Sequence, residues 1–236
     1  MKTILVSWSG GLDSTYLIYD YLKKGHIVKA FYTKLINNDN KVAFELDAIK
    51  KLSQQFTAEF GDMFIFYKES SEFMIATPSG KNDIVLSQPP IWLLSLLFIL
   101  NKGIDEVAIG YVMNDCAISF LQDIQRVYKA YQPFFRNKLP KLIFPLTKLT
   151  KDSLYEQLPK NYYENTVTCE QPLITSNGTY VPCYNCIPCK HKMEFDSAYT
   201  NIIPTLPSSP VEWGSKVQVV KKLNQHYLTS IKENLI

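Results

Sequence analysis

The chain contains few arginines and only a small excess of positive charge. Of its 25 Lys and Arg residues only two are arginines, Arg126 and Arg136, and the formal net charge is +3. Arginine is the side chain best suited to bidentate phosphate contacts, and RNA affinity is built largely on such contacts. The composition therefore argues against a nucleic-acid-binding protein, and so small a net charge does not indicate binding to an anionic membrane surface.

Long hydrophobic stretches are also absent. The longest apolar run covers residues 91–100 and is interrupted by Ser95. A membrane-spanning helix needs about 20 apolar residues, so we expect no transmembrane segment. The apolar residues 4–6 near the amino end are too few for the core of a signal peptide. We therefore expect a cytoplasmic protein that does not contact a membrane.

What the chain does contain is the composition and periodicity of a packed domain. Hydrophobic residues make up 46% of its 236 residues and charged residues 20%, which excludes global disorder. Short apolar runs typical of buried strands lie at 3–7, 27–32, 63–67, 106–110 and 141–144. Between and after them, helical periodicity indicates a helix that follows Ser14 and ends near Gly25, and further helices at 42–60, 91–100, 119–131 and 151–158. This alternation predicts an α/β fold with an open, doubly wound, mostly parallel sheet.

The rest of the chain has a different character. Residues 68–90 are polar and contain several prolines, which indicates a long loop. From residue 161 the helical periodicity ends, so we expect one domain at 1–160 and a second, loop-rich region at 161–236. Within that region, residues 216–235 are amphipathic and predict a helix that docks back on the domain.

Four of the five cysteines fall within 21 residues of the second region. Cys169, Cys183, Cys186 and Cys189 supply the four thiolates that a closed tetrahedral zinc site requires. Because the module lacks a core of its own, zinc would contribute much of its folding energy. A [4Fe–4S] cluster is the alternative. His191 is either a substitute ligand or, as we favour, a solvated loop residue, and we expect Cys116 to be a buried structural thiol.

A second cluster of informative residues lies between the first strand and the first helix. The sequence there reads Ser9-Gly10-Gly11-Leu12-Asp13-Ser14. Two glycines let the backbone approach an anion closely, and the amino end of the following helix directs free N–H groups at the same point. Ser9, Ser14 and Thr15 add hydroxyl groups, and Asp13 would orient the loop or help to hold a divalent cation. We interpret the segment as a phosphate-binding turn rather than an ordinary strand-to-helix connection.

This string resembles the PP-loop of the ATP pyrophosphatases, which cleave ATP between the α and β phosphates. The resemblance implies an adenine nucleotide alpha hydrolase-like fold, with ATP and Mg²⁺ as cofactors. It also implies that the end of the second strand, Phe31 to Thr33, lies near the adenine. The ATP-binding residues implied in this way are Ser7, Ser9, Gly10, Gly11, Leu12, Asp13, Ser14, Thr15, Phe31 and Thr33.

Taken together, the turn, the four cysteines and the chain length resemble the 7-cyano-7-deazaguanine synthase family, over residues 2–190. Two further stretches add to this resemblance: residues 110–115, a glycine followed by an aspartate, and Phe144-Pro145-Leu146 with a lysine downstream. The resemblance implies a C–N ligase that converts 7-carboxy-7-deazaguanine, ammonia and ATP into the nitrile precursor of queuosine, with structural zinc. The catalytic residues that it implies are Asp13, Ser14, Asp115 and Lys151. We also expect a homodimer and a small-molecule substrate.

Three other functions remain open. The family carries Pro-x-Arg-Asn where this chain reads Gln88-Pro89-Pro90, so the adenylated acid could instead be joined to an amine of a protein partner. A tRNA-modifying enzyme is a further alternative, against which the scarcity of arginine argues. The last is a zinc-stabilised interaction module without catalysis, which the intact Asp13 and Ser14 argue against.

Overall fold

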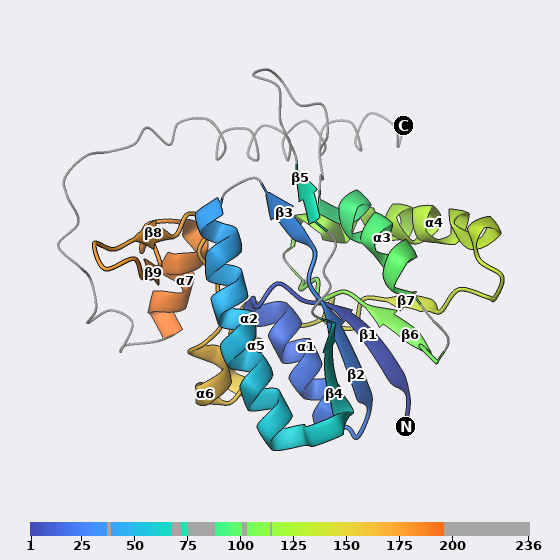
Figure 1. The fold of residues 1–236 in the computed structure, drawn as a ribbon, viewed down its shortest axis with the longest axis horizontal. Coiled ribbons are helices and arrows are strands. Elements are labelled where there is room, and N and C mark those ends of the chain that lie inside the picture. Colours follow the sequence, from blue (N-terminus) through green and yellow to red (C-terminus); the bar gives the residue numbers. More distant parts are fainter. Residues whose placement is uncertain (37–38, 68–71, 75–87, 101–102, 114, 196–236) are drawn as a thin grey trace, which may run out of the picture. The chain divides into compact units, whose positions relative to one another are not determined.

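A computed structural model describes residues 1–36, 39–67, 72–74, 88–100, 103–113 and 115–195, and residues 1–200 group as one compact unit. Its centre is a five-stranded sheet in the order β4-β2-β1-β6-β7, in which every pair of neighbours is parallel (Figure 1). The strands are β1 (Thr3–Ser7), β2 (Ile27–Phe31), β4 (Phe64–Tyr67), β6 (Glu106–Ala108) and β7 (Lys141–Ile143). The parallel sheet expected from the sequence is confirmed.

Helices cover both faces of this sheet because alternate strand residues point to opposite sides. Ile4 and Val6 of β1 belong to one buried cluster, while Leu5 belongs to the other. The first cluster includes residues of α1 (Leu12–Lys23), α2 (Asp39–Phe60), α5 (Lys151–Gln157) and α6 (Lys160–Tyr163). The second includes residues of α3 (Gln88–Ile99) and α4 (Leu121–Ala130), which Figure 1 shows side by side, away from α1 and α2. The expected α/β fold is therefore confirmed.

Several elements differ from the expected ones. α3 begins at Gln88, three residues early, because prolines are tolerated in the first turn of a helix, where their missing N–H groups have no partner to lose. Within the range expected to be a loop, Glu72–Met74 forms β5, which pairs in parallel with β3 (Lys34–Ile36). The helix expected at 119–131 is the 3₁₀ turn η2 (Cys116–Phe120) followed by α4. Two more 3₁₀ turns are η1 (Gly61–Met63) and η3 (Gln132–Phe134).

The cysteine-containing region has more regular structure than expected. A short antiparallel pair, β8 (Leu173–Ile174) and β9 (Tyr180–Val181), precedes α7 (Ile187–Phe195). The region was expected to be rich in loops around its cysteines, and α7 adds a helix there: it begins directly after the third cysteine and carries the fourth. The amphipathic stretch at 216–235 lies outside the described residues, and the domain boundary at 160/161 stays a prediction.

Trp8 anchors the segment that leaves β1. Its side chain is 1% exposed, and its ring lies 5.6–6.0 Å from the rings of Phe56, Phe64 and Phe66 in edge-on arrangements. Its indole N–H donates to Thr15 Oγ1 over 3.0 Å. Aromatic contacts of this kind add stability beyond the area that they bury, so the glycine turn that follows begins from a rigid position.

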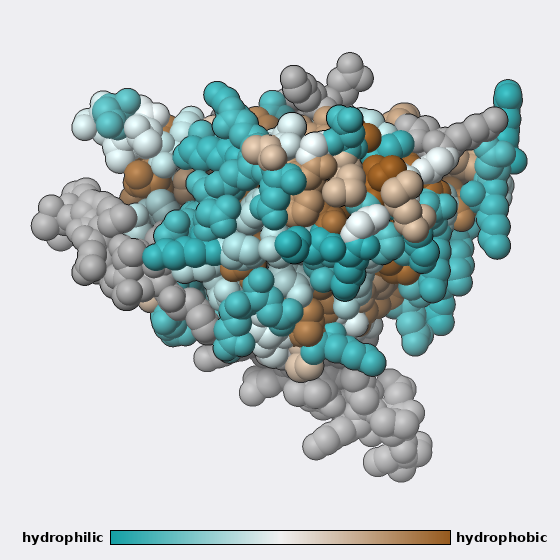
Figure 2. Space-filling view, turned by 90° about the horizontal axis from the view of Figure 1, so that it is seen from below, coloured by the Kyte–Doolittle hydropathy of each residue, from teal (hydrophilic) through white to brown (hydrophobic). Residues whose placement is uncertain are grey.

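The surface combines hydrophilic and hydrophobic side chains. Figure 2 shows one face on which hydrophilic side chains predominate and hydrophobic ones gather in smaller groups between them. Of the described helices, none combines the length and the apolar character needed to cross a bilayer.

Candidate functional site

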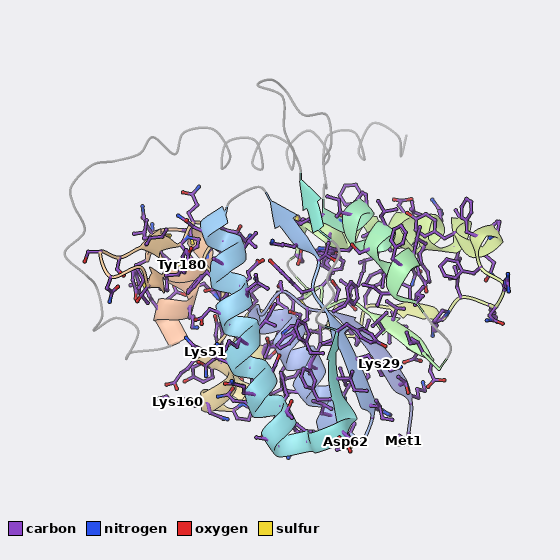
Figure 3. The ribbon with its side chains drawn as sticks, in the orientation of Figure 1. Met1, Lys29, Lys51, Asp62, Lys160 and Tyr180 are labelled. Carbon is purple, nitrogen blue, oxygen red and sulfur yellow. The ribbon has the colours of Figure 1, made fainter. Side chains whose placement is uncertain are left out.

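The order of the strands predicts a crevice at the carboxyl ends of the central strands. From β1 the chain proceeds to β2 on one side, and it returns later to β6 on the other side of β1. In open parallel sheets, ligands bind at this reversal point, outside the carboxyl ends of the strands. Met1 and Asp62, just before β1 and β4, lie at the opposite edge (Figure 3). The reversal point is therefore where a site is expected.

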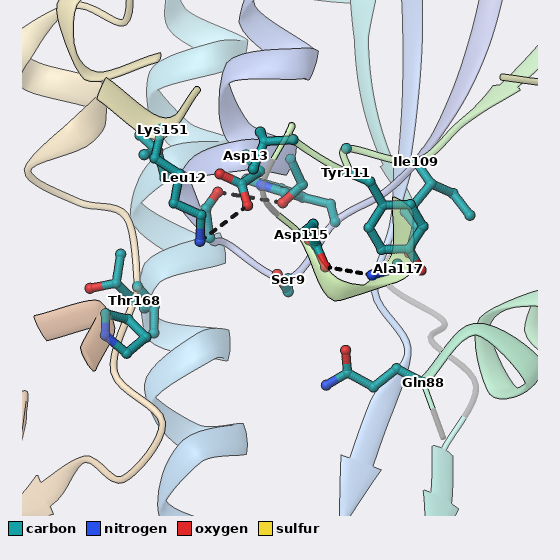
Figure 4. Close-up of a pocket in the computed structure, with 18 of the residues that line it drawn as sticks. Ser9, Leu12, Asp13, Gln88, Ile109, Tyr111, Asp115, Ala117, Lys151 and Thr168 are labelled. Carbon is teal, nitrogen blue, oxygen red and sulfur yellow. Dashed lines mark hydrogen bonds and ion pairs between the residues drawn. The ribbon is translucent and has the colours of Figure 1, made fainter. Parts of the chain in front are cut away.

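A cavity of about 860 Å³ opens at this point. Its wall is formed by the segments that follow β1, β2 and β6, by the start of α5, and by two stretches of the cysteine-containing region. Polar side chains from opposite walls, Gln88 and Thr168, face this space across the close-up view (Figure 4). The volume is large enough for a nucleotide together with a small second substrate.

The glycine turn forms the floor of this cavity. Gly10 has a φ of +73°, a left-handed conformation that glycine adopts without strain. Gly11 is the N-cap of α1. Because glycine has no side chain to accept a hydrogen bond from the first amides of the helix, these amides keep free N–H groups. Because residues 11–14 line the cavity, these N–H groups and the positive end of the helix dipole are available to an anion there.

The loop after β6 packs directly against the start of α1. A Cβ atom added to Gly110 would lie 3.2 Å from the backbone carbonyl carbon and oxygen of Asp13, and 3.3 Å from the amide nitrogen of Ser14. A side chain at this position would push the first turn of α1 away. Gly110 therefore lets the loop that carries Asp115 approach the glycine turn closely.

Asp13 is a largely buried carboxylate beside a lysine at the cavity. Its Oδ2 lies 3.7 Å from Nζ of Lys151, the first residue of α5 (Figure 4). Burial raises the pKa of Asp13, the positive charge of Lys151 opposes this rise, and the negative charge of Asp115 adds to it. Lys151 therefore favours the ionised form of a carboxylate whose pKa burial raises.

Unpaired polar atoms gather in the same cavity. Four lining residues have a buried side-chain oxygen for which the described residues offer no hydrogen-bond partner: Asp13 Oδ1, Thr33 Oγ1, Tyr111 Oη and Thr168 Oγ1. A buried polar group without a partner costs about 1–3 kcal/mol. These oxygens come from four different segments and line one space, which is the arrangement expected of a site for a polar ligand.

The cavity wall is more acidic than basic. Two lysines line it, Lys41 and Lys151, against five carboxylates: Asp13, Glu45, Asp115, Asp152 and Glu170. Lys41 is paired with Glu170 over 2.6 Å. A triphosphate would be repelled by such a wall unless a divalent cation accompanied it. Carboxylate oxygens are the ligands that Mg²⁺ prefers, so the unpaired oxygen of Asp13 fits the magnesium ion expected from the sequence.

A second acidic group lies beside the end of β2. The Tyr32 hydroxyl donates to Glu45 Oε2 over 2.6 Å. Burial raises the pKa of Glu45, which the hydrogen bond from Tyr32 and the charge of Lys41 partly oppose. Burial and the Glu45 charge raise the pKa of Tyr32 as well, so this hydroxyl stays protonated. The hydrogen bond between Tyr32 and Glu45 fixes the positions of two polar side chains in this wall of the cavity, next to Thr33.

Most of the predicted nucleotide-site residues line the cavity, and three do not. Those that line it are Ser7, Ser9, Gly11, Leu12, Asp13, Ser14, Thr33, Asp115 and Lys151. Gly10 packs instead against α2, with Ile49 close by. The hydroxyl of Thr15 faces the core, where it accepts the Trp8 indole bond, and the fully buried Phe31 belongs to the core under α3. The structure therefore does not place the side chains of Thr15 and Phe31 at the cavity.

Several residues that line the cavity could not be identified from the sequence. Lys41, Glu45 and Glu170 gave no signal, because charged residues on a helix face or in a loop usually face solvent. Tyr111 belongs to the stretch 110–115 that the sequence singled out, but its place in the cavity wall was not predicted. There its ring lies 6.0 Å from that of Trp92. Only the packing of distant segments could identify these residues.

The four clustered cysteines come together as the spacing predicted. The sulfur atoms of Cys169, Cys183, Cys186 and Cys189 all lie within 4.8 Å of one another. The Cys183 amide donates to the Cys169 sulfur over 3.2 Å, and the Cys186 amide to the Cys183 sulfur over 3.4 Å. Tyr184, between them, has a φ of 55°, which turns the chain tightly. Such N–H donors stabilise metal-bound thiolates, and the four cysteines could hold a metal ion.

The remaining thiol and imidazole differ from expectation. Cys116 is exposed and lines the cavity, so the expectation of a buried structural thiol was wrong. Asp115 holds it at the surface, because its carboxylate fixes the start of η2. His191 lies on α7 rather than in a loop, and its Nε2 is 3.1 Å from Asp152 Oδ1. In the part of the chain that the structure describes, the metal-binding group comprises the four cysteines without this histidine.

The cysteine-containing region is bonded directly to the glycine turn. The Val167 amide donates to the Gly10 carbonyl over 2.9 Å. The preceding chain is held by Lys192 of α7, which is 1% exposed and donates to the carbonyls of Tyr163 and Thr166 over 3.1 and 2.9 Å. A buried ammonium with carbonyl acceptors is a strong constraint, so the position of α7 bears on the position of the turn.

No protein-family model matches this sequence, and no curated protein matches it.

Proposed function

We propose that the protein transfers the AMP portion of ATP to a carboxylate, with release of pyrophosphate, and that ammonia then replaces AMP. The observation that carries this proposal is the glycine turn at the start of α1, which lines a cavity at the reversal point of a parallel sheet. The resemblance of that turn to the PP-loop supports pyrophosphate as its ligand. The acid that we propose is 7-carboxy-7-deazaguanine.

The turn would act on the leaving group. As a carboxylate oxygen of the substrate attacks the α-phosphorus, the bond to the β-phosphate bridging oxygen breaks and that oxygen gains negative charge. The free amides of the first turn of α1, with the hydroxyls of Ser9 and Ser14, are placed to stabilise this charge. Lys151 would neutralise phosphate charge, and Asp13 would help to hold Mg²⁺. Bound Mg²⁺ would supply further charge neutralisation on the phosphate oxygens.

The opposite wall would hold the acid. Asp115 and Gln88 line the cavity beside Tyr111 and Trp92, so they offer polar partners next to aromatic rings. Ammonia would attack the acyl carbon, AMP would leave with the electrons of the broken acyl–oxygen bond, and the spare proton of the ammonium would pass to solvent. A second ATP would then activate the amide oxygen as an adenylate, with release of pyrophosphate. Loss of two protons from the nitrogen and departure of AMP with the electron pair of the carbon–oxygen bond would give the nitrile.

Product analysis tests the reaction directly. With ATP, Mg²⁺, ammonia and 7-carboxy-7-deazaguanine, we expect AMP and pyrophosphate in equal amounts and only when the acid is present. ADP and phosphate as the sole products would contradict the proposal.

We further propose that the metal ion is zinc. In a tetrahedral zinc site, Zn–S bonds of about 2.3 Å place the sulfurs roughly 3.8 Å apart. The four sulfurs here are already within 4.8 Å, whereas an iron–sulfur cluster spreads its cysteines around several iron atoms. Bound zinc would contribute folding energy rather than chemistry, because four thiolates leave no open coordination position.

A second candidate keeps the adenylation and changes the acceptor to an amine of a protein partner. Gln88 and Pro89 line the cavity, and these positions fall within the stretch where the resembled family carries its Pro-x-Arg-Asn signature. Because this part of the wall differs from that of the resembled family, a second substrate other than ammonia is favoured. Mass spectrometry of the product formed with ammonia as the only amine separates the two candidates.

The acid side of the pH profile depends on Lys151. In Lys151→Met the charge that lowers the Asp13 pKa is lost, so this already raised pKa rises further. Because the ionised carboxylate is the active form, the fall in activity at low pH should begin at higher pH in the variant, while Lys151→Arg should keep the wild-type profile. The measurement is pyrophosphate exchange into ATP as a function of pH.

Lys160→Met is the matched control, because Lys160 is exposed, pairs with Glu164 and does not line the cavity. If Lys151→Met and Lys160→Met had the same profile as the wild type, the proposed influence of Lys151 on Asp13 would be wrong.

A further inference from the structure

We propose that the thiol of Cys116 accepts the acyl group from the adenylate and carries it, as a thioester, to an amine outside the cavity. This inference rests on the proposed adenylation and adds a covalent step to it. The step belongs with the second candidate function, because its final acceptor is a primary amine too large to enter the cavity, such as one on a protein.

The position of Cys116 is the first reason. It is the exposed cysteine of the described chain, whereas the three most buried ones belong to the metal-binding group. It lines the same cavity as the glycine turn, on the loop that Gly110 brings against Asp13. Asp13 is largely buried and Cys116 reaches the surface. The Cys116 thiol, on a loop that packs against the glycine turn, is therefore suited to carry a group from the depth of the cavity to its mouth.

The neighbour of Cys116 is the second reason. Asp115 Oδ1 lies 3.6 Å from the Cys116 sulfur and also accepts the Ala117 amide over 3.1 Å. The backbone bond fixes the carboxylate, so the thiol has a proton acceptor in a defined position. Burial and the Asp115 charge raise the pKa of Cys116, which keeps the resting group as a thiol.

An unpaired hydroxyl next to this dyad is the third reason. Tyr111 is 5% exposed, and its Oη has no partner among the described residues, although it lines the cavity. Its ring lies between those of Trp92 and Phe144, at 6.0 and 5.8 Å. A planar acid lying against these rings could pair with the hydroxyl, on the same loop as Cys116. The hydroxyl therefore points independently to a ligand at this place.

The chemistry balances without any further reactant. The Cys116 sulfur attacks the acyl carbon of the adenylate, its proton passes to Asp115, and AMP leaves with the electron pair of the acyl–oxygen bond. The amine nitrogen then attacks the thioester, an amide bond forms, and the carbon–sulfur bond breaks. The thiolate takes back the proton from Asp115, and the proton lost by the amine passes to solvent. ATP cleavage supplies the driving force for both steps.

The test uses the full-length, metal-loaded protein with ATP, Mg²⁺ and 7-carboxy-7-deazaguanine, without ammonia or any other amine. After acid quenching, the intact wild-type protein should gain the mass of the acid minus one water. Neutral hydroxylamine should remove this addition, and peptide mapping should place it on Cys116. Cys116→Ala should lose the addition completely, and any adduct on Cys116→Ser should resist hydroxylamine.

Pyrophosphate exchange into ATP, measured in the same samples, separates the two proposals. Exchange in the wild type without a protein adduct would overturn the thioester and leave the adenylation standing. An adduct on another residue would also overturn it. If 7-carboxy-7-deazaguanine supported no exchange, both proposals would fail. Metal content and thermal unfolding of each variant show whether a lost adduct reflects a lost fold.

Discussion

Replacing Gly10 with alanine should lower pyrophosphate exchange by about 10²- to 10³-fold, the loss seen when a preorganised oxyanion donor is removed. Gly10 has a φ of +73°, where an alanine is strained by roughly 1–2 kcal/mol. In addition, its Cβ would lie 3.2 Å from Ile49 Cγ1 and 3.4 Å from Ala48 Cβ. The turn would have to move away from α2, and the amides of α1 would no longer meet the departing pyrophosphate.

Gly25→Ala is the matched control for this variant. Gly25 has nearly the same φ, +75°, and a Cβ there would have no neighbour within 4 Å. It follows the opposite end of α1, away from the cavity. Gly25→Ala therefore measures the stability cost of the strained φ alone, Gly10→Ala should lose at least as much stability in thermal unfolding, and only Gly10→Ala should lose exchange. Equal exchange in the two variants would show that the turn does not hold the leaving group.

The fold could be predicted largely because its strands are short, apolar and separated by helices with clear periodicity. The turn at Gly10 and the cysteine spacing were visible for the same reason: each depends on residues close together in the sequence. β3 and β5 were not predicted, since they pair with each other across a long separation and neither carries a strong strand pattern. The prolines near α3 suggested a loop, although they fit the first turn of a helix.

The composition of the cavity wall could not be predicted, because distant segments form it. Glu45 on α2 and Glu170 beside the cysteines meet only through the docking of that region onto α2. Thr15 shows the reverse case. Its hydroxyl follows a string that resembles a phosphate-binding loop, yet the Trp8 indole satisfies it in the core. Sequence spacing identifies which residue types are available, and packing determines which of them face the ligand.

Loss of one clustered cysteine should have the largest effect on stability. In Cys186→Ser the metal-binding group loses one of its four sulfurs, and structural zinc contributes roughly 10–16 kcal/mol in zinc-finger peptides. Even a third of that would lower the Tm of a protein of this size by about 7–20 °C. We expect metal analysis to find one zinc per wild-type chain and far less in Cys186→Ser. Cys116→Ser should keep its metal, because Cys116 lies outside the group.

The same variant should bind ATP more weakly, although Cys186 does not line the cavity. Val167 donates its amide to the Gly10 carbonyl, and Lys192 of α7 holds the chain just before it. Disorder in α7 would therefore release the glycine turn. Coupling of this kind is reciprocal, so bound ATP should raise the chelator concentration needed to remove half of the metal by the same factor by which the metal tightens ATP binding. A chelator curve that ATP does not shift would mean that the turn and the metal site are independent.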